Sequence, residues 1–370
     1  MVWLLLCSLA FAGDEVITLK KGEKAPWDGT LMSPSAVAHM LAKEEADLAT
    51  CLADAKKDKA LITAEKDFEI QTAEAKLAKC TFESTRKEEL YLERIDWLEK
   101  NLTAPNLRIF DCTVWLKPQH NKIYKIFSGK PDYDKEHIPN SDFLDVLELS
   151  DKNSKYDFMM PDLEVFSNIM SLKGVGPNTH VILYSRENIQ WATRVWWMLK
   201  SVNFSNISIL NGGFDRWKLE NKTVSKLPVT YPKNNFRGNN QRGFFCKKEE
   251  IINNIENQKV LIVNALRKTL HNGIENINYG RPGHIKNSIN IPSTEMINKN
   301  TYLYKSTKEL KKIFNEYNLF NKEKVITYCG GGIAATNVAF AITMIGFKNI
   351  TIYDGSLNEW AKDNRLPLEI

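Results

Sequence analysis

Cysteine is scarce in this 370-residue chain, and its six copies follow no regular spacing. Neither a disulfide framework nor a zinc site fits that scatter, and we expect no metal and no cofactor. Loss of an N-terminal leader would remove Cys7 and leave an odd number of thiols, at least one of them unpaired: Cys51, Cys80, Cys112, Cys246 and Cys329. A free thiol is unremarkable in a reducing compartment and conflicts mildly with an oxidising one.

Blocks of lysine or arginine interleaved with aromatic residues are also missing, so no nucleic-acid partner is expected. The chain has 50 basic and 45 acidic residues, and its 43% hydrophobic and 26% charged residues are ordinary for a soluble globular protein. No apolar run is long enough to span a bilayer. The length allows two or three domains.

Residues 1–12 form a short apolar stretch that ends Ala10-Phe11-Ala12 and is followed by polar residues. This pattern is typical of a signal peptide with a small-residue cleavage site, although the lysines that usually precede the apolar core are missing. A real leader would make the protein exported or secreted. The sequence by itself leaves the compartment unknown.

The first hundred residues contain no asparagine, and no proline or glycine after Pro34. Ser33-Pro34 fits an N-cap followed by proline at the first helical position, which predicts one or two long helices from Ser35 to Asn101. From Asn101 onward asparagine, isoleucine and lysine abound. We therefore expect a separate helical segment over residues 13–104, joined near 101–106 to a segment of different history.

Apolar positions in the helical segment recur at helical but imperfect heptad spacing. Self-association as a coiled coil and a solvated single helix both fit this pattern. On one continuous helix Cys51 and Cys80 would lie ~44 Å apart at about 1.5 Å per residue, too far for a disulfide bond between them.

Short apolar runs alternate with helical patterns from residue 107 onward, which is an α/β rhythm. Strands are expected at 107–110, 181–184 and 207–210, with a helix through 191–201. Residues 223–243 are rich in turn formers and are expected to be a surface linker. The rhythm predicts one domain over 105–222 and a second over 244–370.

The second domain repeats the first, and the matching segments are 137–141 with 284–288, 204–213 with 347–356, and Trp217 with Trp360. Internal duplication at domain length is therefore visible in the sequence itself. The repeat fails at one informative place. The apolar run of the first copy ends Tyr184-Ser185, whereas that of the second ends Tyr328-Cys329.

Cys329 follows a β-branched run that is too short for a buried helix and indicates a central strand of a parallel sheet. Three glycines come next, and then a helical pattern over 337–345. Consecutive glycines let successive N–H groups curl toward the sulfur. Those amides and the positive end of a helix stabilise a thiolate, so the pattern predicts a nucleophile.

Two other interpretations of Cys329 are open. It could be a small buried residue at a strand end, since free cysteine is often buried, but such a residue has no need of three following glycines. A phosphate-binding cysteine loop would require an arginine to neutralise the phosphoryl oxygens. Ala335 and Thr336 stand where that arginine belongs, and phosphatase activity is not expected.

Several spaced motifs resemble the rhodanese family, specifically its two-domain sulfurtransferases that use thiosulfate or 3-mercaptopyruvate. The resemblance covers about residues 105–370 and rests on segments 134–140, 159–161, 194–198 and 211–217 and on the Cys329 loop. It implies tandem α/β domains, each a mainly parallel sheet flanked by helices, the first inactive and the second catalytic, after the long helical N-terminal segment. It also implies a mitochondrial or cytoplasmic location.

The resemblance further implies that Cys329 takes a sulfane sulfur as a persulfide and yields it to cyanide or a thiol. Arg194 matches the family arginine that reaches the anionic end of the donor. The expected partners are thus a small-molecule donor and acceptor. The expected donor-binding set is Arg194, Gly330, Gly331, Gly332, Ile333, Ala334 and Ala335.

The chain departs from the family where substrates are chosen. Gly330 and Gly331 are neutral, whereas thiosulfate-preferring relatives carry basic residues there. Gly331 also replaces the serine of a proposed serine–histidine–aspartate relay, whose other members match Asp111 and His137, two residues that are also well explained as structural. A catalytically weak rhodanese pair that serves as a scaffold or sulfur-carrier protein is therefore the alternative function.

Overall fold

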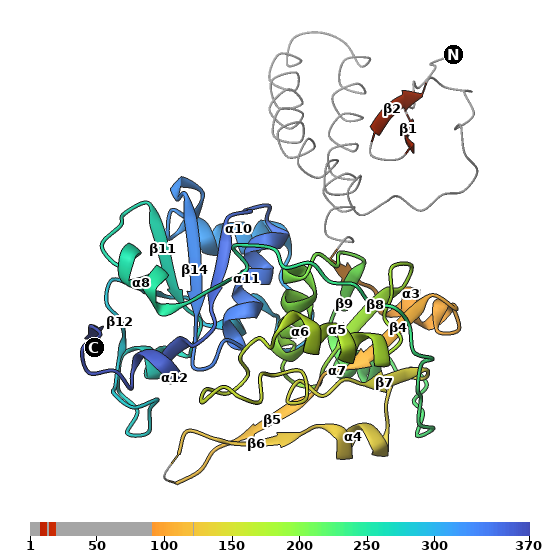
Figure 1. Ribbon diagram of the computed structural model, residues 1–370, viewed down its shortest axis with the longest axis horizontal. Coiled ribbons are helices and arrows are strands. Elements are labelled where there is room, and N and C mark those ends of the chain that lie inside the picture. The colour runs from red at the N-terminus through yellow and green to blue at the C-terminus, as the bar shows by residue number, and fades with distance from the viewer. Residues whose placement is uncertain (1–7, 13–14, 20–90, 121) are drawn as a thin grey trace. The chain divides into compact units, whose positions relative to one another are not determined.

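The computed structural model describes residues 8–12, 15–19, 91–120 and 122–370. It divides into two units, Met1–Glu89 and Leu90–Ile370 (Figure 1). In the first unit, strands β1 (Ser8–Ala12) and β2 (Glu15–Leu19) form an antiparallel hairpin. The predicted helices over 35–90, their coiled-coil pairing and Cys51 and Cys80 lie outside the described residues. The signal peptide stays a prediction.

The first half of the second unit is built on a five-stranded parallel sheet of order β3-β9-β8-β4-β7. Its strands are β3 (Leu92–Glu93), β4 (Leu107–Asp111), β7 (Ser141–Phe143), β8 (His180–Tyr184) and β9 (Ile207–Leu210). The helices are α3 (Ile95–Asn101), α4 (Lys130–Lys135), α5 (Leu163–Leu172), α6 (Gln190–Ser201) and α7 (Gly213–Leu219). An antiparallel hairpin of β5 (Val114–Lys117) and β6 (Lys125–Ser128) extends from this half.

The second half repeats that plan with a parallel sheet of order β10-β15-β14-β11-β13. Its strands are β10 (Phe245–Cys246), β11 (Val260–Asn264), β13 (Ile289–Asn290), β14 (Lys324–Tyr328) and β15 (Ile350–Tyr353). Its helices are α8 (Lys248–Asn254), α9 (Lys268–His271), α10 (Thr307–Asn315), α11 (Ala334–Met344) and α12 (Ser356–Trp360), with 3₁₀ turns η1 (Ser293–Met296) and η2 (Leu319–Asn321). Strands β12 (His284–Ile285) and β16 (Leu368–Glu369) form a separate antiparallel pair. The two sheets have the same strand order, so the predicted tandem α/β architecture is confirmed.

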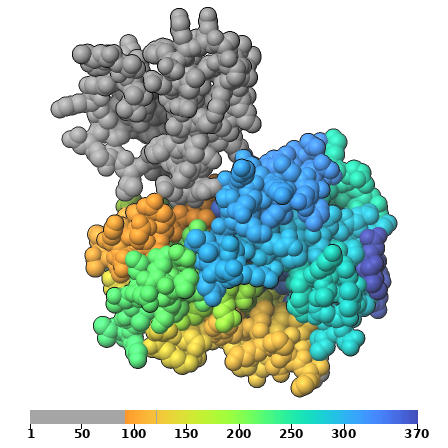
Figure 2. Space-filling view, turned by 180° about the vertical axis from the view of Figure 1, so that it is seen from behind, coloured from red at the N-terminus to blue at the C-terminus, as the bar shows by residue number. Residues whose placement is uncertain are grey.

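The two halves share one hydrophobic core, which lies between the sheets. Helices α6 and α11 pack against each other at its centre, where the Thr193 and Thr336 hydroxyls are 2.7 Å apart. The edge of a Trp196 ring meets the Phe340 ring, with centroids 4.9 Å apart. Figure 2 shows the first half, orange to green, in direct contact with the blue second half. Because the core is continuous, side chains of one half can be positioned against loops of the other.

Residues 223–243 connect the halves without a helix or a named strand, as the turn-rich composition predicts. They cover the first half on their way, because Phe236 is buried and the Tyr231 hydroxyl accepts a 2.9 Å hydrogen bond from the Ile109 N–H. No helix in the described part of the chain is both long and apolar enough to cross a membrane.

The expected start of the first domain at residue 105 is too late. Strand β3 pairs with β9 in parallel, and Ile95 and Leu98 of α3 are buried against the outer face of the sheet. The prediction that one or two long helices reach Asn101 is wrong at this end, since Leu92 and Glu93 are extended and α3 begins only at Ile95. The residues before α3 have the same helix-favouring composition as α3 itself, so the sequence contains no signal for this two-residue edge strand.

Candidate active site

Strand β14 delivers Cys329 to the carboxyl edge of the second sheet. It is hydrogen-bonded to β11 on one side and β15 on the other, with Ile326 opposite Ile262. Val325 to Tyr328 are buried, as β-branched and aromatic residues on a doubly covered strand should be. Cys329 follows directly and is 2% exposed. The predicted central strand is therefore present, and it ends at the thiol.

The glycines after Cys329 allow other groups to approach its backbone closely. A Cβ on Gly330 would lie 1.9 Å from the Tyr279 hydroxyl, and one on Gly331 would lie 3.5 Å from the Phe158 ring. Gly332 has φ +74°, a left-handed conformation that glycine adopts without strain. The loop then enters α11 through Ile333, Ala334 and Ala335, so the predicted order of strand, glycine loop and helix is observed.

The first turn of α12 also contacts the Cys329 loop and bonds to its backbone. The Cys329 N–H donates to the Ser356 hydroxyl at 3.1 Å, and the carbonyl of Cys329 accepts from the Leu357 N–H at 3.1 Å. The Asn358 N–H donates to the Gly330 carbonyl at 2.8 Å. The backbone of the loop is thereby fixed, which keeps the thiol in one position.

Arg194 braces the loop from the first half. Its Nη1 donates to the Asp354 carboxylate at 2.6 Å and to the Gly332 carbonyl at 3.4 Å, and its Nη2 donates to the Phe158 carbonyl. The arginine is fully buried, and Asp354 also accepts the Met160 N–H at 2.8 Å. The positive charge that we expected to meet the donor is thus matched by a carboxylate, while its Nε is buried without a hydrogen-bond partner in the described structure.

Two tyrosines that the sequence analysis missed lie beside Cys329. Tyr124, at the end of the β5–β6 hairpin, and Tyr279, from the second half, make an edge-to-face contact with ring centroids 6.4 Å apart. Burial chiefly, and then the neighbouring Asp157 and Cys329, raise the pKa of Tyr124. Burial, followed by Tyr124 and Cys329, raises the pKa of Tyr279 well above its usual value. Both phenols therefore stay neutral near neutral pH and can donate hydrogen bonds to a negatively charged sulfur.

The charge of Arg267 reaches this site, since it lowers the pKa of Tyr279, although burial, Tyr124 and Cys329 have larger effects that raise that pKa. Its guanidinium forms a two-point ion pair with Glu275. The arginine is therefore already paired at the rim. Cys329 is thus surrounded by backbone dipoles and neutral phenols, the cations Arg194 and Arg267 are both paired, and the Asp157 carboxylate acts on Tyr124.

Asp111 and His137 both lie in the first half, and their hydrogen-bond partners in the described structure are not in the Cys329 loop. Asp111 is fully buried and pairs with Arg186 at 3.1 Å, and burial raises its pKa despite that partner. The His137 ring stacks on Tyr133 and bonds to the Tyr133 and Leu227 carbonyls at 2.8 and 3.0 Å. Their observed partners hold the first half together, which agrees with the structural explanation of both residues.

The other described thiols are poor nucleophiles. Burial, with help from Asp111, raises the pKa of Cys112 well above its usual value. Burial also raises the pKa of Cys246 to about 12. Both are free cysteines, and neither is followed by a glycine loop. Because the thiolate is the reactive form, Cys329 is the candidate that remains.

Comparisons with known proteins agree with this geometry. The model of the rhodanese-like domain matches residues 94–220 and 247–363. The 3-mercaptopyruvate sulfurtransferase of Mus musculus is 30% identical over 278 residues, covering 71% of this chain and 89% of its own. The thiosulfate sulfurtransferase of Cricetulus griseus is 28% identical over 273 residues, with the same coverage of both chains.

A solved structure is similar as well. The crystal structure of SseA from Escherichia coli, described as a 3-mercaptopyruvate sulfotransferase with the rhodanese fold, matches with a TM-score of 0.64 and 27% identity, covering 72% of this chain and 98% of SseA. The paired matches coincide with the two halves of the structure, and the homology supports a sulfurtransferase function. The chain therefore belongs to the rhodanese family, of which it contains two consecutive domains.

Proposed function

We propose that the protein transfers a sulfane sulfur through a persulfide on Cys329. The observation that carries the proposal is the thiol at the end of a central parallel strand, followed by Gly330 to Gly332 and flanked by neutral phenols. The Cys329 thiolate attacks the outer sulfur of the donor. The bond between that sulfur and the rest of the donor breaks, and its electron pair leaves with sulfite from thiosulfate or, after protonation, with pyruvate from 3-mercaptopyruvate.

In the second half-reaction a nucleophilic acceptor, cyanide or a thiol, attacks the outer sulfur of the persulfide. The sulfur–sulfur bond breaks, and its electron pair returns to Cys329 as a thiolate. Tyr124 and Tyr279 serve this step by donating hydrogen bonds toward the departing sulfur. Arg194 serves it indirectly, since its ion pair with Asp354 and its bond to Gly332 hold the loop in place.

The preferred donor under this proposal is 3-mercaptopyruvate. 3-Mercaptopyruvate brings one carboxylate charge and thiosulfate brings two charges, and each of them has to be bound by dipoles instead of by a free cation. Arg194 is already paired with Asp354, and Gly330 and Gly331 add no charge. A missing charged hydrogen bond costs roughly 1.5–3 kcal/mol, which corresponds to about ten- to hundredfold in affinity.

A second candidate function is a rhodanese pair with little catalytic power that binds or carries sulfur compounds. The observation that favours it is closure of the site, because Cys329 is 2% exposed beneath residues from both halves. Steady-state assays with each donor and cyanide distinguish the two candidates. Turnover that Cys329→Ser abolishes and Cys246→Ser preserves supports the enzyme, whereas equal background rates in all three proteins support the carrier.

A further inference from the structure

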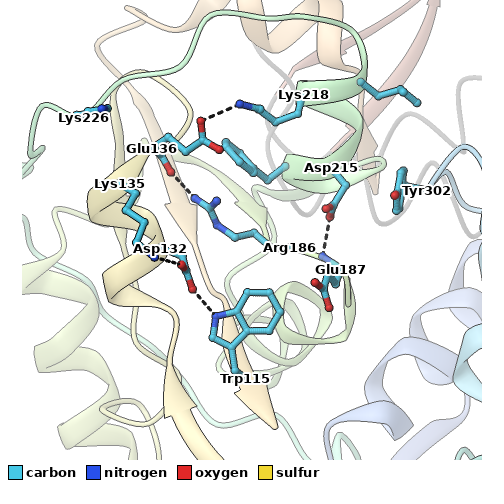
Figure 3. Close-up of a pocket in the computed structure, with 12 residues that line it drawn as sticks. Trp115, Asp132, Lys135, Glu136, Arg186, Glu187, Asp215, Lys218, Lys226 and Tyr302 are labelled. Atoms are coloured by element: carbon cyan, nitrogen blue, oxygen red, sulfur yellow. Dashed lines mark hydrogen bonds and ion pairs between the residues drawn. The ribbon is translucent and has the colours of Figure 1, made fainter. Parts of the chain in front are cut away.

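A cavity lies on the first half, where α4, α7 and the loop after β8 meet, with Tyr302 of the second half at its edge (Figure 3). Its volume is about 830 Å³, within the range of small-molecule sites. Ser185, the counterpart of Cys329, begins this loop, and its hydroxyl is bonded to the Asn188 carbonyl at 2.7 Å. The cavity is therefore at the carboxyl edge of a parallel sheet, where α/β proteins commonly bind ligands.

One side of the cavity presents an incompletely used guanidinium. Arg186 is 7% exposed, and its Nε donates to Asp111 at 3.1 Å. Its Nη2 donates to the Glu136 carbonyl, and its Cζ lies 3.8 Å from the centre of the Phe214 ring. No residue in the described ranges accepts a hydrogen bond from its Nη1. Lys226 on the same side is exposed and has no ion-pair partner among the described residues. These two cations suit a carboxylate.

The opposite side presents two carboxylates, those of Asp215 and Glu187, that form no salt bridge in the described structure. Asp215 accepts the Glu187 N–H at 2.6 Å, and burial raises its pKa even though that hydrogen bond and the charge of Arg186 lower it. The Glu187 side chain is exposed and unpaired, unlike Glu136, which binds Lys218 at 2.7 Å. Figure 3 shows Asp215 and Glu187 on one side of the Arg186 guanidinium and Lys226 on the other. This side suits an ammonium group.

Apolar surface continues beyond the carboxylates. Leu219 lies one turn after Asp215 on α7 and is 53% exposed, and Tyr302 is 37% exposed at the same cavity. A ligand held through its ammonium by Asp215 could therefore rest an apolar side chain on this wall. A simple anion would face Asp215 and Glu187, and a simple cation would face Arg186 and Lys226.

We propose that this cavity binds an α-amino acid zwitterion with an apolar side chain, its carboxylate on Arg186 and Lys226 and its ammonium on Asp215 and Glu187. The site is separate from Cys329 and requires no chemistry there. Loss of one charged contact should weaken binding by roughly ten- to hundredfold. An amino acid that lacks an apolar side chain should bind more weakly, because it leaves the Leu219 and Tyr302 wall uncovered.

The test is calorimetric titration of the full-length protein with L-phenylalanine, glycine, 3-phenylpropanoate and 2-phenylethylamine. Saturable binding of L-phenylalanine at one site is expected, and each single-charge analogue should bind at least about tenfold more weakly. Asp215→Asn should weaken L-phenylalanine binding by about tenfold or more while keeping an acceptor for the Glu187 N–H. Asp134→Asn, a matched change outside the cavity, should have no effect.

Two further variants keep the test decisive. Lys226→Met alters an exposed side chain and should weaken binding even if Asp215→Asn fails to fold. Cys329→Ser should bind L-phenylalanine as the unchanged protein does, whatever becomes of sulfur transfer. The proposal is overturned by the absence of saturable L-phenylalanine binding, by equal binding of 3-phenylpropanoate, by affinity that survives both cavity substitutions, or by loss of binding in Cys329→Ser.

Discussion

The loops after β8 and β14 occupy equivalent places in the two halves and contain opposite kinds of residue. In the first half Ser185 is followed by Arg186, which is buried in an ion pair with Asp111. In the second half Cys329 is followed by Gly330, and the Tyr279 hydroxyl lies where a side chain would project. One loop is filled by its own arginine, while the other is open to groups from elsewhere. The duplicated fold supplies the position, and the loop residues determine the chemistry.

The contacts between the halves differ in the same way. Asp354 accepts the Met160 N–H at 2.8 Å, and its counterpart Asn211 accepts the Tyr304 N–H through Oδ1 at 2.9 Å. Both bonds join one half to the other. Only the bond at Asp354 is accompanied by a charge, that of Arg194, and it lies against the Cys329 loop. The second copy thus has the stronger contact beside Cys329, the residue that we propose as the nucleophile.

Exchanging the two loop residues should produce the largest effect. Cys329→Ser should lower sulfur transfer to cyanide by at least about ten-thousandfold, because the hydroxyl is a far weaker nucleophile toward sulfur. Adding Ser185→Cys to this variant should not restore activity, since the loop of the first half is filled by Arg186. Cys246→Ser is the matched control and should keep full turnover. Recovery of activity in the double variant would contradict the distinction between the loops.

Truncation tests the edge strand of the first sheet, which has an equivalent in the second sheet. A chain that begins at Ala104 loses β3, the counterpart of β10, together with buried Leu92, Ile95 and Leu98. At about 1.5–3 kcal/mol for each buried side chain, we expect a loss of roughly 5 kcal/mol in the free energy of unfolding. A chain that begins at Leu90 should retain the stability of the second unit. Urea unfolding of both chains checks this, and equal midpoints would show that β3 and α3 are dispensable.

Loss of the buried ion pair between Arg194 and Asp354 should have the next largest effect. Arg194→Met leaves the Asp354 carboxylate without its cation, and we expect a loss of about 3–5 kcal/mol in the free energy of unfolding. Asn337 is the counterpart of Arg194 and makes neutral bonds to Ser293 and Tyr304. Asn337→Leu should therefore cost less, about 1–3 kcal/mol.

Removing both charges of the Arg194–Asp354 ion pair refines that prediction. The double variant Arg194→Met with Asp354→Asn should recover part of the stability lost in Arg194→Met, because no unpaired charge stays buried. Chemical denaturation of the three variants measures these differences. An Arg194→Met protein as stable as the Asn337→Leu protein would show that the charge adds nothing to the link.

Donor choice should change least. Gly331→Lys places a cation at the position of Glu187 in the other loop, and it should improve kcat/KM for thiosulfate relative to 3-mercaptopyruvate by about ten- to hundredfold. Gly331→Gln, a long neutral side chain, is the matched control for crowding against Phe158. Kinetics with both donors at fixed cyanide provide the measurement. A clear thiosulfate preference in the unchanged protein would show that the charge count does not set the choice.

Much of this arrangement was predictable from the sequence because its signals are local. Alternation of apolar runs with helical patterns predicted the strands around 181–184 and 207–210. Matching segments in the two copies, such as 204–213 and 347–356, revealed the duplication. The glycines after Cys329 identified the candidate nucleophile before any contact was known. Each of these inferences depends on residues that are close together along the chain.

The features that were missed depend on residues far apart in sequence. Arg194 meets Asp354 only when the halves pack, and Tyr124 reaches Tyr279 only through the β5–β6 hairpin. One signal could have revealed the first contact. Arg194 of the first copy corresponds to Asn337 of the second, and Asp354 of the second copy corresponds to Asn211 of the first. Each copy thus has one charged residue where the other has asparagine, and such paired differences point to an ion pair.

The most direct test of the account is to locate the transferred sulfur. The protein is incubated with 3-mercaptopyruvate, separated from the excess donor, alkylated and digested. The masses of the peptides containing Cys112, Cys246 and Cys329 are then measured by mass spectrometry. We predict one additional sulfur on the Cys329 peptide only, and its loss after treatment with cyanide as thiocyanate forms. Sulfur on the Cys112 or Cys246 peptide, or an unmodified Cys329 peptide from protein that still produces thiocyanate, would contradict the central claim.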